Sequence, residues 1–326
     1  MRCRKPALSA GSERKATAIL AADIHLRDTT PVCRTDDFRG AMERKLDFIR
    51  ALQKEHGGIP VLVAGDVFDH WKPSPELLRW SIEHIQNWIC IPGQHDLPQH
   101  SLELYGKSGL AVLEAAGCVT VLTDSYYEYV TETTQIVGFP WGVEPGPISK
   151  LNNYAVALVH RLVYLGEAPF PGAEVSGSTA KALLQKMEGF DLVVTGDNHE
   201  TFVVNEDSVT SYRWTVGSCG NGERLLINPG SMMRTTVKQA EHEPCVFLWY
   251  TGTNTVERVV LPHRKGVVDR THLDRIEERD ERLEAFVSRL REDVEVGLNY
   301  RENLKHYLQS NPVPKAIKDI VWEVLP

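Results

Sequence analysis

The first hundred residues alternate apolar runs with amphipathic segments, and this alternation restricts the fold more than any other feature. The apolar runs are 17–23, 59–66 and 88–93, and the amphipathic segments 36–58 and 74–86 lie between them. The runs are apolar without interruption, as strands are when both faces of a sheet are covered. The order strand, helix, strand, helix, strand therefore predicts a parallel sheet covered by helices.

Both amphipathic segments carry the signals of helices. Segment 36–58 repeats apolar residues at helical spacing and ends at Gly57-Gly58. Segment 74–86 begins with Ser74, a preferred N-cap residue, followed by Pro75 at the first helical position.

The second half of the chain contains closely spaced apolar runs with few helices between them after residue 190. These predicted strands are 134–140, 154–160, 191–197, 224–230, 244–250 and 255–261. Their spacing predicts a second, more antiparallel sheet. We therefore expect an α/β fold in which a two-sheet β-sandwich core is flanked by α-helices.

The chain divides into three predicted parts. Residues 1–16 form a flexible lead-in without the apolar core of a secretion signal, 17–262 form the main domain, and 263–326 form a helical C-terminal extension. Within the extension, 271–309 is rich in Glu, Arg and Leu and is amphipathic. Such a helical tail packs on its own core or binds a partner.

Composition argues against a membrane-spanning protein, a disulfide-rich protein and a protein with a broad basic face. The 326 residues are 42% hydrophobic and 25% charged, and no apolar run is long enough to span a membrane. The six cysteines are scattered without a C-x-x-C pair, which favours reduced thiols in a cytoplasmic protein. The net charge of −8 argues against a broad basic face for nucleic acid, although bound cations would still allow phosphate binding.

Polar residues capable of metal binding follow five of the predicted strands. They are Asp23 and His25, then Asp66 and Asp69, then Gln94, His95 and Asp96, then His160, and finally Asp197 and His199. A single Asp or His after a strand is usually a cap or turn residue. Together, however, they would converge where open α/β sheets place their sites, and mixed Asp/His sets suit divalent Mn, Fe or Zn.

The complete pattern resembles the calcineurin-like metallophosphoesterase superfamily. The motifs D-x-H, G-D-x-x-D, G-N-H-D/E, H and G-H-x-H correspond to 23–25, 65–69, 93–96, 160 and 196–199, and the resemblance covers residues 18 to about 262. It implies a two-layer β-sandwich flanked by helices that holds two divalent metal ions. We expect Mn²⁺, with Fe, Zn or Mg as alternatives.

The resemblance also implies a ligand for each metal. Asp23, His25 and His199 would hold the first metal, Asp66 would bridge both, and Gln94, His160 and Asp197 would complete the second. Gln94 stands where the family usually has Asn, and Asp197 stands where the first His of G-H-x-H normally lies. Both departures concern the second metal, and the added oxygen favours a harder ion such as Mn²⁺ there.

The remaining polar residues have expected supporting roles. His95 is the candidate general acid that protonates the leaving oxygen, with Asp96 orienting its ring. The alternative for His95 is a structural role beside the ligands. Asp69 is expected to support the Asp66 loop.

The substrate is predicted from a narrower resemblance. Protein phosphatases usually extend the second motif to G-D-x-V-D-R-G, whereas this chain has "GDVFDHWKP" and looks more like the DNA-repair exonuclease branch. In that branch Ser231 and Arg234 of "NPGSMMRTT" could meet a phosphate backbone, although the same segment reads equally as a turn. The sequence after Pro262 is too short for that branch's capping domain.

The expected function is a two-metal phosphodiesterase acting on DNA, most simply as an exonuclease or other repair-type nuclease. Two alternatives stay open, namely a phosphomonoesterase or nucleotide phosphodiesterase on the same site, and a non-catalytic scaffold. The resemblance also suggests an ATPase or homodimer partner bound through the C-terminal helices at 272–309.

Overall fold

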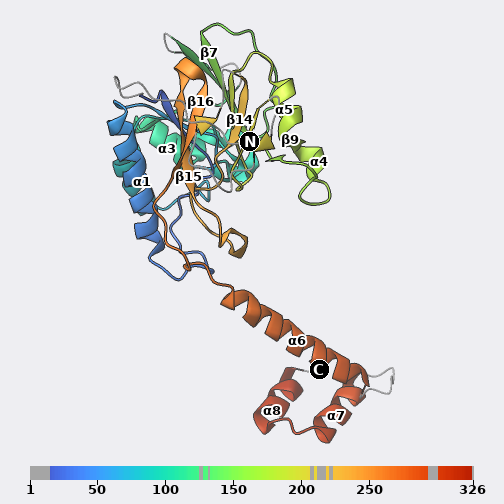
Figure 1. Cartoon of the computed structure of the whole chain (residues 1–326). Coiled ribbons are helices and arrows are strands. Elements are labelled where there is room, and N and C mark those ends of the chain that lie inside the picture. Colours follow the sequence, from blue (N-terminus) through green and yellow to red (C-terminus); the bar gives the residue numbers. More distant parts are fainter. Residues whose placement is uncertain are drawn as a thin grey trace. The chain divides into compact units, whose positions relative to one another are not determined.

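The computed structural model describes two compact units of the chain. The described residues are 15–124, 128–130, 133–205, 209–210, 218–219, 223–292 and 300–324. One unit is Met1–Asp269 and the other is Arg270–Pro326, and each is considered by itself (Figure 1). The predicted lead-in falls almost wholly outside the described residues.

Two seven-stranded sheets form the centre of the first unit. The first sheet has the order β13-β16-β15-β1-β2-β3-β4 and the second the order β12-β11-β14-β10-β7-β6-β5. The strands of the first sheet are β1 (Ala18–Ala21), β2 (Val61–Val63), β3 (Trp88–Cys90), β4 (Val119–Val121), β13 (Ser218–Cys219), β15 (Cys245–Tyr250) and β16 (Thr255–Val260). Those of the second are β5 (Glu128–Val130), β6 (Thr134–Phe139), β7 (Tyr154–His160), β10 (Leu192–Gly196), β11 (Phe202–Asn205), β12 (Val209–Thr210) and β14 (Leu225–Asn228). A separate pair joins β8 (Val163–Tyr164) to β9 (Ser178–Thr179).

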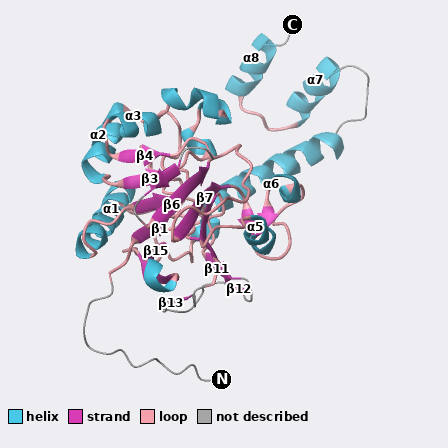
Figure 2. Ribbon diagram, turned by 90° about the horizontal axis from the view of Figure 1, so that it is seen from above, coloured by secondary structure: helices cyan, strands magenta, loops and turns pink. Residues whose placement is uncertain are grey.

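Alternation along the strands builds a four-layer core. In β1, Ala18 and Leu20 point into a cluster shared by both sheets, while Ile19 and Ala21 point into a second cluster with the helices. The helices on the first sheet are α1 (Phe38–Glu55), α2 (Pro75–His84) and α3 (Gly109–Ala115). On the second sheet, α5 (Ala180–Lys186) closes a third apolar cluster, near the short helix α4 (Ala173–Ser176). Figure 2 shows these helices outside the strands, which confirms the predicted sandwich.

The two leading helices begin where the sequence signals place them. Asp37 caps α1 by accepting a hydrogen bond from Gly40 N, and Ser74 caps α2 by accepting one from Leu77 N at 3.1 Å. Pro75 occupies the first helical position, where its missing N–H costs nothing. Three short 3₁₀ turns, Gln94–Asp96, Pro98–His100 and Leu102–Lys107, connect β3 to α3.

The second sheet differs from the predicted antiparallel arrangement. Its central strands β6, β7, β10 and β14 pair in parallel, and only its outer strands pair antiparallel. The closely spaced strands β15 and β16 instead form a hairpin that joins β1 of the first sheet. Spacing along the chain predicted both strands but placed them in the second sheet, because the choice of sheet depends on long-range pairing.

The second unit consists of helices. They are α6 (Thr271–Glu292), α7 (Tyr300–Ser310) and α8 (Lys315–Val324). The described residues of the predicted tail 271–309 are therefore helical, and 293–299 lie outside the described residues. Exposed apolar side chains are Leu283, Phe286, Val287, Ile317, Ile320, Trp322 and Val324. None of the helices within the described ranges is long and apolar enough to cross a membrane.

Candidate metal centre

The predicted ligands gather at one edge of the sandwich because parallel strands of both sheets end there. β1, β2 and β3 run in parallel in one sheet, as do β7 and β10 in the other. Each of these strands is followed by, or ends in, one or more of the predicted site residues. Hydrogen bonds connect the two sheets at this edge, since Asp197 N donates to Asp23 Oδ1 at 3.0 Å.

The first group of ligand atoms comes from Asp23, His25 and His199, whose ligand atoms lie within 4.8 Å of one another. The Nε2 atoms of the two histidines are 3.1 Å apart. Both Asp23 and His25 are buried, and Asp23 Oδ2 has no hydrogen-bond partner among the described residues.

The second group consists of Asp23, Asp66 and His160, so Asp23 belongs to both groups. Asp66 Oδ2 lies 3.4 Å from His160 Nε2 and 3.9 Å from His25 Nε2. This position between the two histidines suits the predicted bridging role of Asp66. Its Oδ1 accepts a hydrogen bond from His95 N at 2.9 Å, while Oδ2 has no hydrogen bond within the described part of the chain.

Backbone strain is concentrated at these residues. Asp23, His25, Asp66 and Asp197 all have positive φ, which non-glycine residues rarely adopt and which tends to occur at functional sites. Gly93 is required for a different reason, because a Cβ there would collide with Asp66 Oδ1. The chain therefore approaches the carboxylate more closely than any other residue type would allow.

The site's charges fit a bound cation. Burial raises the pKa of Asp23 above its ordinary value, although His160 opposes this effect. Burial alone would lower the pKa of His160, but the carboxylates of Asp66 and Asp23 raise it to about 10. Two buried carboxylate oxygens without hydrogen-bond donors are costly unless positive charge compensates them, and divalent ions do so in Asp/His sites.

The two departures from the family pattern contact each other. Gln94 Nε2 donates to Asp197 Oδ1 at 2.6 Å, and Gln94 Oε1 lies 2.6 Å from His160 Nε2. The ring of His160 is fixed from the other side, because Nδ1 donates to Ala64 O at 2.7 Å. Gln94 and Asp197 thus both lie beside the second group, and their role as ligands of a second metal stays a prediction.

The structure differs from the prediction for Asp96. Its carboxylate accepts hydrogen bonds from the backbone of Val67, Phe68 and Gly93. His95 instead uses Nδ1 to donate to the carbonyl oxygen of Asp69 at 2.9 Å. Adjacent residues of the 3₁₀ turn point in different directions, so Asp96 supports the Asp66 and Gly93 loops rather than the ring of His95.

His95 itself is exposed at the site. Its ring centroid lies 5.2 Å from that of His25 in an edge-on arrangement. Because Nδ1 carries the hydrogen donated to the Asp69 carbonyl, Nε2 carries a proton in the imidazolium form of the ring and accepts one in the neutral form. Asp69 also places Oδ1 at 3.7 Å from His25 Nδ1 and pairs with Arg27, which agrees with a supporting role.

Ser231 and Arg234 are not placed to meet a phosphate at the metal ligands. Ser231 is fully buried, and its Oγ donates to Met233 O at 2.8 Å. The guanidinium of Arg234 is also buried and donates to the carbonyl oxygens of Ala240 and Arg264. Both residues hold the loop that follows β14 through these hydrogen bonds. This agrees with the alternative in which the segment is a turn.

Gln239 is a site residue that was not predicted. Its Nε2 lies 3.2 Å from His199 Nδ1 and donates to Ser231 Oγ at 2.7 Å. Its Oε1 accepts from the backbone of Thr235 and Thr236, which fixes the amide orientation. Gln239 therefore positions the ring of His199, but it follows no strand and belongs to no motif.

The comparison with protein families assigns the class of this site. The profile described as calcineurin-like phosphoesterase matches residues 17–201, more than half of the chain. The protein therefore belongs to the calcineurin-like phosphoesterase family. Members of this family are hydrolases with a dinuclear metal site, and the Asp/His cluster lies where such a site is expected.

The comparison with solved structures finds chains of low sequence identity with TM-scores below 0.5. A metallophosphoesterase from Sphaerobacter thermophilus is 12% identical, with a TM-score of 0.40 over 77% of this chain and 89% of that one. A calcineurin-like phosphoesterase from Bacillus subtilis is 10% identical, with a TM-score of 0.41 over 77% of this chain and 93% of that one. A 5'-nucleotidase precursor from Thermus thermophilus is 14% identical, with a TM-score of 0.43 over 75% of this chain and 54% of that one. The comparison with curated proteins gives no significant match.

Proposed function

We propose that the protein is a two-metal phosphodiesterase whose substrate is DNA. The observation that supports this most strongly is the pair of Asp/His groups that share Asp23. In the proposal, Asp23, His25 and His199 would hold one metal, Gln94, His160 and Asp197 would hold the other, and Asp66 would contribute to both. Oxygen atoms dominate the second set, which favours Mn²⁺ over a softer ion.

The metals, when bound, would neutralise charge on the phosphate and lower the pKa of a water molecule. The residues of the chain orient these groups. Asp96 holds the Asp66 loop through backbone hydrogen bonds, and Gln239 holds the ring of His199. His95 is exposed, and in the proposal its imidazolium form donates the proton that the leaving oxygen needs, while the Asp69 carbonyl keeps the ring in place.

DNA is proposed as the substrate from the sequence around the site. The second motif, "GDVFDHWKP", lacks the Arg-Gly that usually follows in protein phosphatases. His70 and Trp71, which occupy this place, have rings 5.5 Å apart beside the Asp69 loop. Aromatic side chains in such a position can stack on exposed bases.

A small phosphoester is the second candidate substrate. The net charge of −8 favours it, because a negatively charged protein repels a long polyanion. In this case the same ligands and the same His95 would act on a phosphomonoester or a nucleotide phosphodiester.

One assay separates the candidates. The protein is incubated with Mn²⁺ and, separately, labelled linear DNA, circular DNA, bis(p-nitrophenyl) phosphate and p-nitrophenyl phosphate. The proposal predicts DNA cleavage that is lost in Asp66→Asn, the control against a contaminating nuclease. Hydrolysis of a small ester without cleavage of either DNA would contradict the DNA proposal and favour the second candidate. Failure with all four substrates and several metals would contradict both.

A further inference from the structure

A pocket lined by basic side chains lies in the first unit, and none of its lining residues is among the predicted metal ligands. Arg44 and Lys45 come from α1, Arg34 and Asp36 from the segment before it, and Arg234 and Arg264 from two later loops. Five of these six side chains are basic, although the chain as a whole is acidic. The cavity measures about 210 Å³, several times the volume of a water molecule.

The basic charges of the pocket are only partly compensated. Asp36 forms a bidentate ion pair with Arg34, with both N···O distances at 2.8 Å. Among the described residues, the hydrogen-bond partners of the Arg234 guanidinium are two neutral carbonyl oxygens. Arg44 and Arg264 are exposed, and neither side chain donates a hydrogen bond to another residue within the described ranges.

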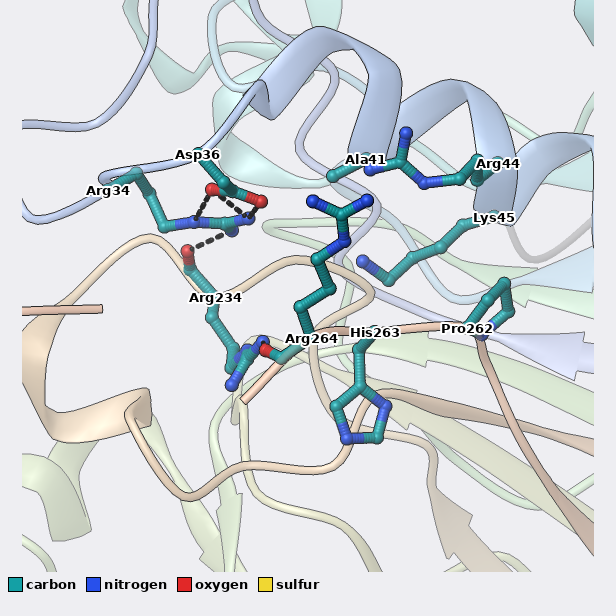
Figure 3. Close-up of a pocket in the computed structure, with 9 residues that line it drawn as sticks. All are labelled: Arg34, Asp36, Ala41, Arg44, Lys45, Arg234, Pro262, His263 and Arg264. Atoms are coloured by element: carbon teal, nitrogen blue, oxygen red, sulfur yellow. Dashed lines mark hydrogen bonds and ion pairs between the residues drawn. The ribbon is translucent and has the colours of Figure 1, made fainter. Parts of the chain in front are cut away.

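Lys45 is the most unusual member of the pocket. Its side chain is 2% exposed, and its ammonium donates only to the thioether of Met233 at 3.4 Å, a weak acceptor. Figure 3 shows Lys45 and Arg264 reaching into the same space from opposite walls. Burial, followed by repulsion from Arg34 and Arg234, lowers the pKa of Lys45 to about 7.

These positions are costly without a ligand. Converging like charges repel, and a buried ammonium without an oxygen acceptor loses its hydration without replacement. A phosphate group would remove both costs, since its oxygens accept charge-assisted hydrogen bonds from lysine and from the forked arginine guanidinium.

We propose that this pocket is a second binding site, apart from the metal centre, that takes a phosphate group between Lys45, Arg44 and Arg264. Of these three lining residues, Lys45 is buried and the two arginines are exposed. The phosphate group can come from a polynucleotide backbone or from a free phosphorylated ligand, which present the same oxygens.

Calorimetric titration of the full chain tests this proposal. The probes are inorganic phosphate and a short single-stranded DNA, each added to protein as purified and to protein stripped of metal over a chelating resin. We expect binding that persists after metal removal and weakens at least tenfold in the double variant Arg44→Glu/Arg264→Glu. The matched control is Arg50→Glu/Lys265→Glu, which reverses two exposed charges on the same helix and the same loop outside the pocket.

The two probes distinguish the source of the phosphate. If DNA binds, competes with phosphate and is weakened by the pocket variant alone, the source is a polynucleotide backbone. If phosphate binds in this way and DNA does not, the source is a smaller ligand. The proposal is overturned if neither probe binds the metal-stripped protein, or if the control variant weakens binding as much as the pocket variant. Either result leaves the metal-centre proposal intact, because no step of the assay measures hydrolysis.

A crystal of the wild-type protein soaked in phosphate provides a second measurement. We expect density within hydrogen-bond distance of Lys45 Nζ and of at least one of the two exposed arginines. Density confined to the Asp/His cluster would contradict the proposal.

Discussion

Gln94 donates a hydrogen bond to Asp197 over 2.6 Å, and these are the two residues that depart from the family's ligand pattern. The amide therefore connects His160 with Asp197, since Gln94 Oε1 lies 2.6 Å from His160 Nε2. The Gln94 amide stands where the family usually has the shorter Asn amide, and the Asp197 carboxylate stands where it usually has a His imidazole. The second metal is thus expected to bind in a separate and weaker step than the first.

Restoring the imidazole should strengthen the second binding step. Asp197 has φ 78, a conformation that histidine tolerates better than most residues. In Asp197→His we expect Zn²⁺ to bind the second site on the order of tenfold more tightly, equivalent to about 1.4 kcal/mol. Competition titration with a chromogenic chelator measures this. Asp197→Asn is the control, and it should weaken the second step because it removes a charge; equal affinities in both variants would exclude Asp197 as a ligand.

His95→Ala tests proton donation to the leaving group. We expect kcat to fall by about 10²–10⁴ with little change in KM, the usual size of a general-acid contribution. The loss should be much smaller for a p-nitrophenolate leaving group, which departs without a proton. An equal loss of kcat on both kinds of substrate would indicate that His95 has only a structural role in the site. Metal content, measured in parallel, should be unchanged.

Gly93→Ala tests the close approach of the backbone to Asp66. A methyl group at Gly93 collides with Asp66 Oδ1 and with the Asp66 backbone nitrogen, so the loops must separate. We expect a loss of about 1–3 kcal/mol in the free energy of unfolding, together with weaker metal binding. Gly106→Ala is the matched control, because a Cβ at Gly106 meets no atom within 4 Å. Comparable denaturation midpoints for the two variants would contradict the packing argument.

The buried ammonium of Lys45 makes stability depend on pH. Its pKa is lowered from 10.5 to about 7, mainly by burial. Below about pH 7 the group is charged in both the folded and unfolded states, and the full cost of burying it is present. Between the two pKa values the unfolded chain binds more protons, so stability rises with pH.

Lys45→Met removes this cost. In phosphate-free buffer near pH 6 we expect the variant to be more stable than the wild type by on the order of 5 kcal/mol, from the size of the pKa shift. The advantage should shrink as the pH rises toward 10. Urea denaturation at several pH values measures it, and a difference independent of pH would show that the ammonium is not the cause.

The strand ends were predictable from the sequence because apolar runs and their polar termini are local features. Asp23, Asp66 and His160 each follow or end such a run, and parallel pairing brings those ends together. The sandwich and its first-sheet helices follow from the same local patterns.

Features that depend on distant pairing or on side-chain direction were not predictable. Adjacency suggested that Asp96 orients His95, yet the 3₁₀ turn directs its carboxylate to backbone N–H groups instead. Gln239 lies 40 residues from His199 along the chain, in the 3₁₀ turn Val237–Gln239. No motif or strand end in the sequence marks it as a neighbour of His199. The parallel pairing at the centre of the second sheet was also not predictable, because the spacing of strands along the chain does not specify which strands pair.

Anomalous diffraction from crystals grown with Mn²⁺ tests the central claim most directly. We expect two anomalous peaks, one bounded by Asp23, His25 and His199 and the other by Asp66 and His160, with the second peak weaker. In Asp66→Asn crystals both peaks should diminish, because this carboxylate lies between the histidines of both groups. Wild-type crystals without a peak at these residues, at Mn²⁺ concentrations that support hydrolysis, would contradict the account.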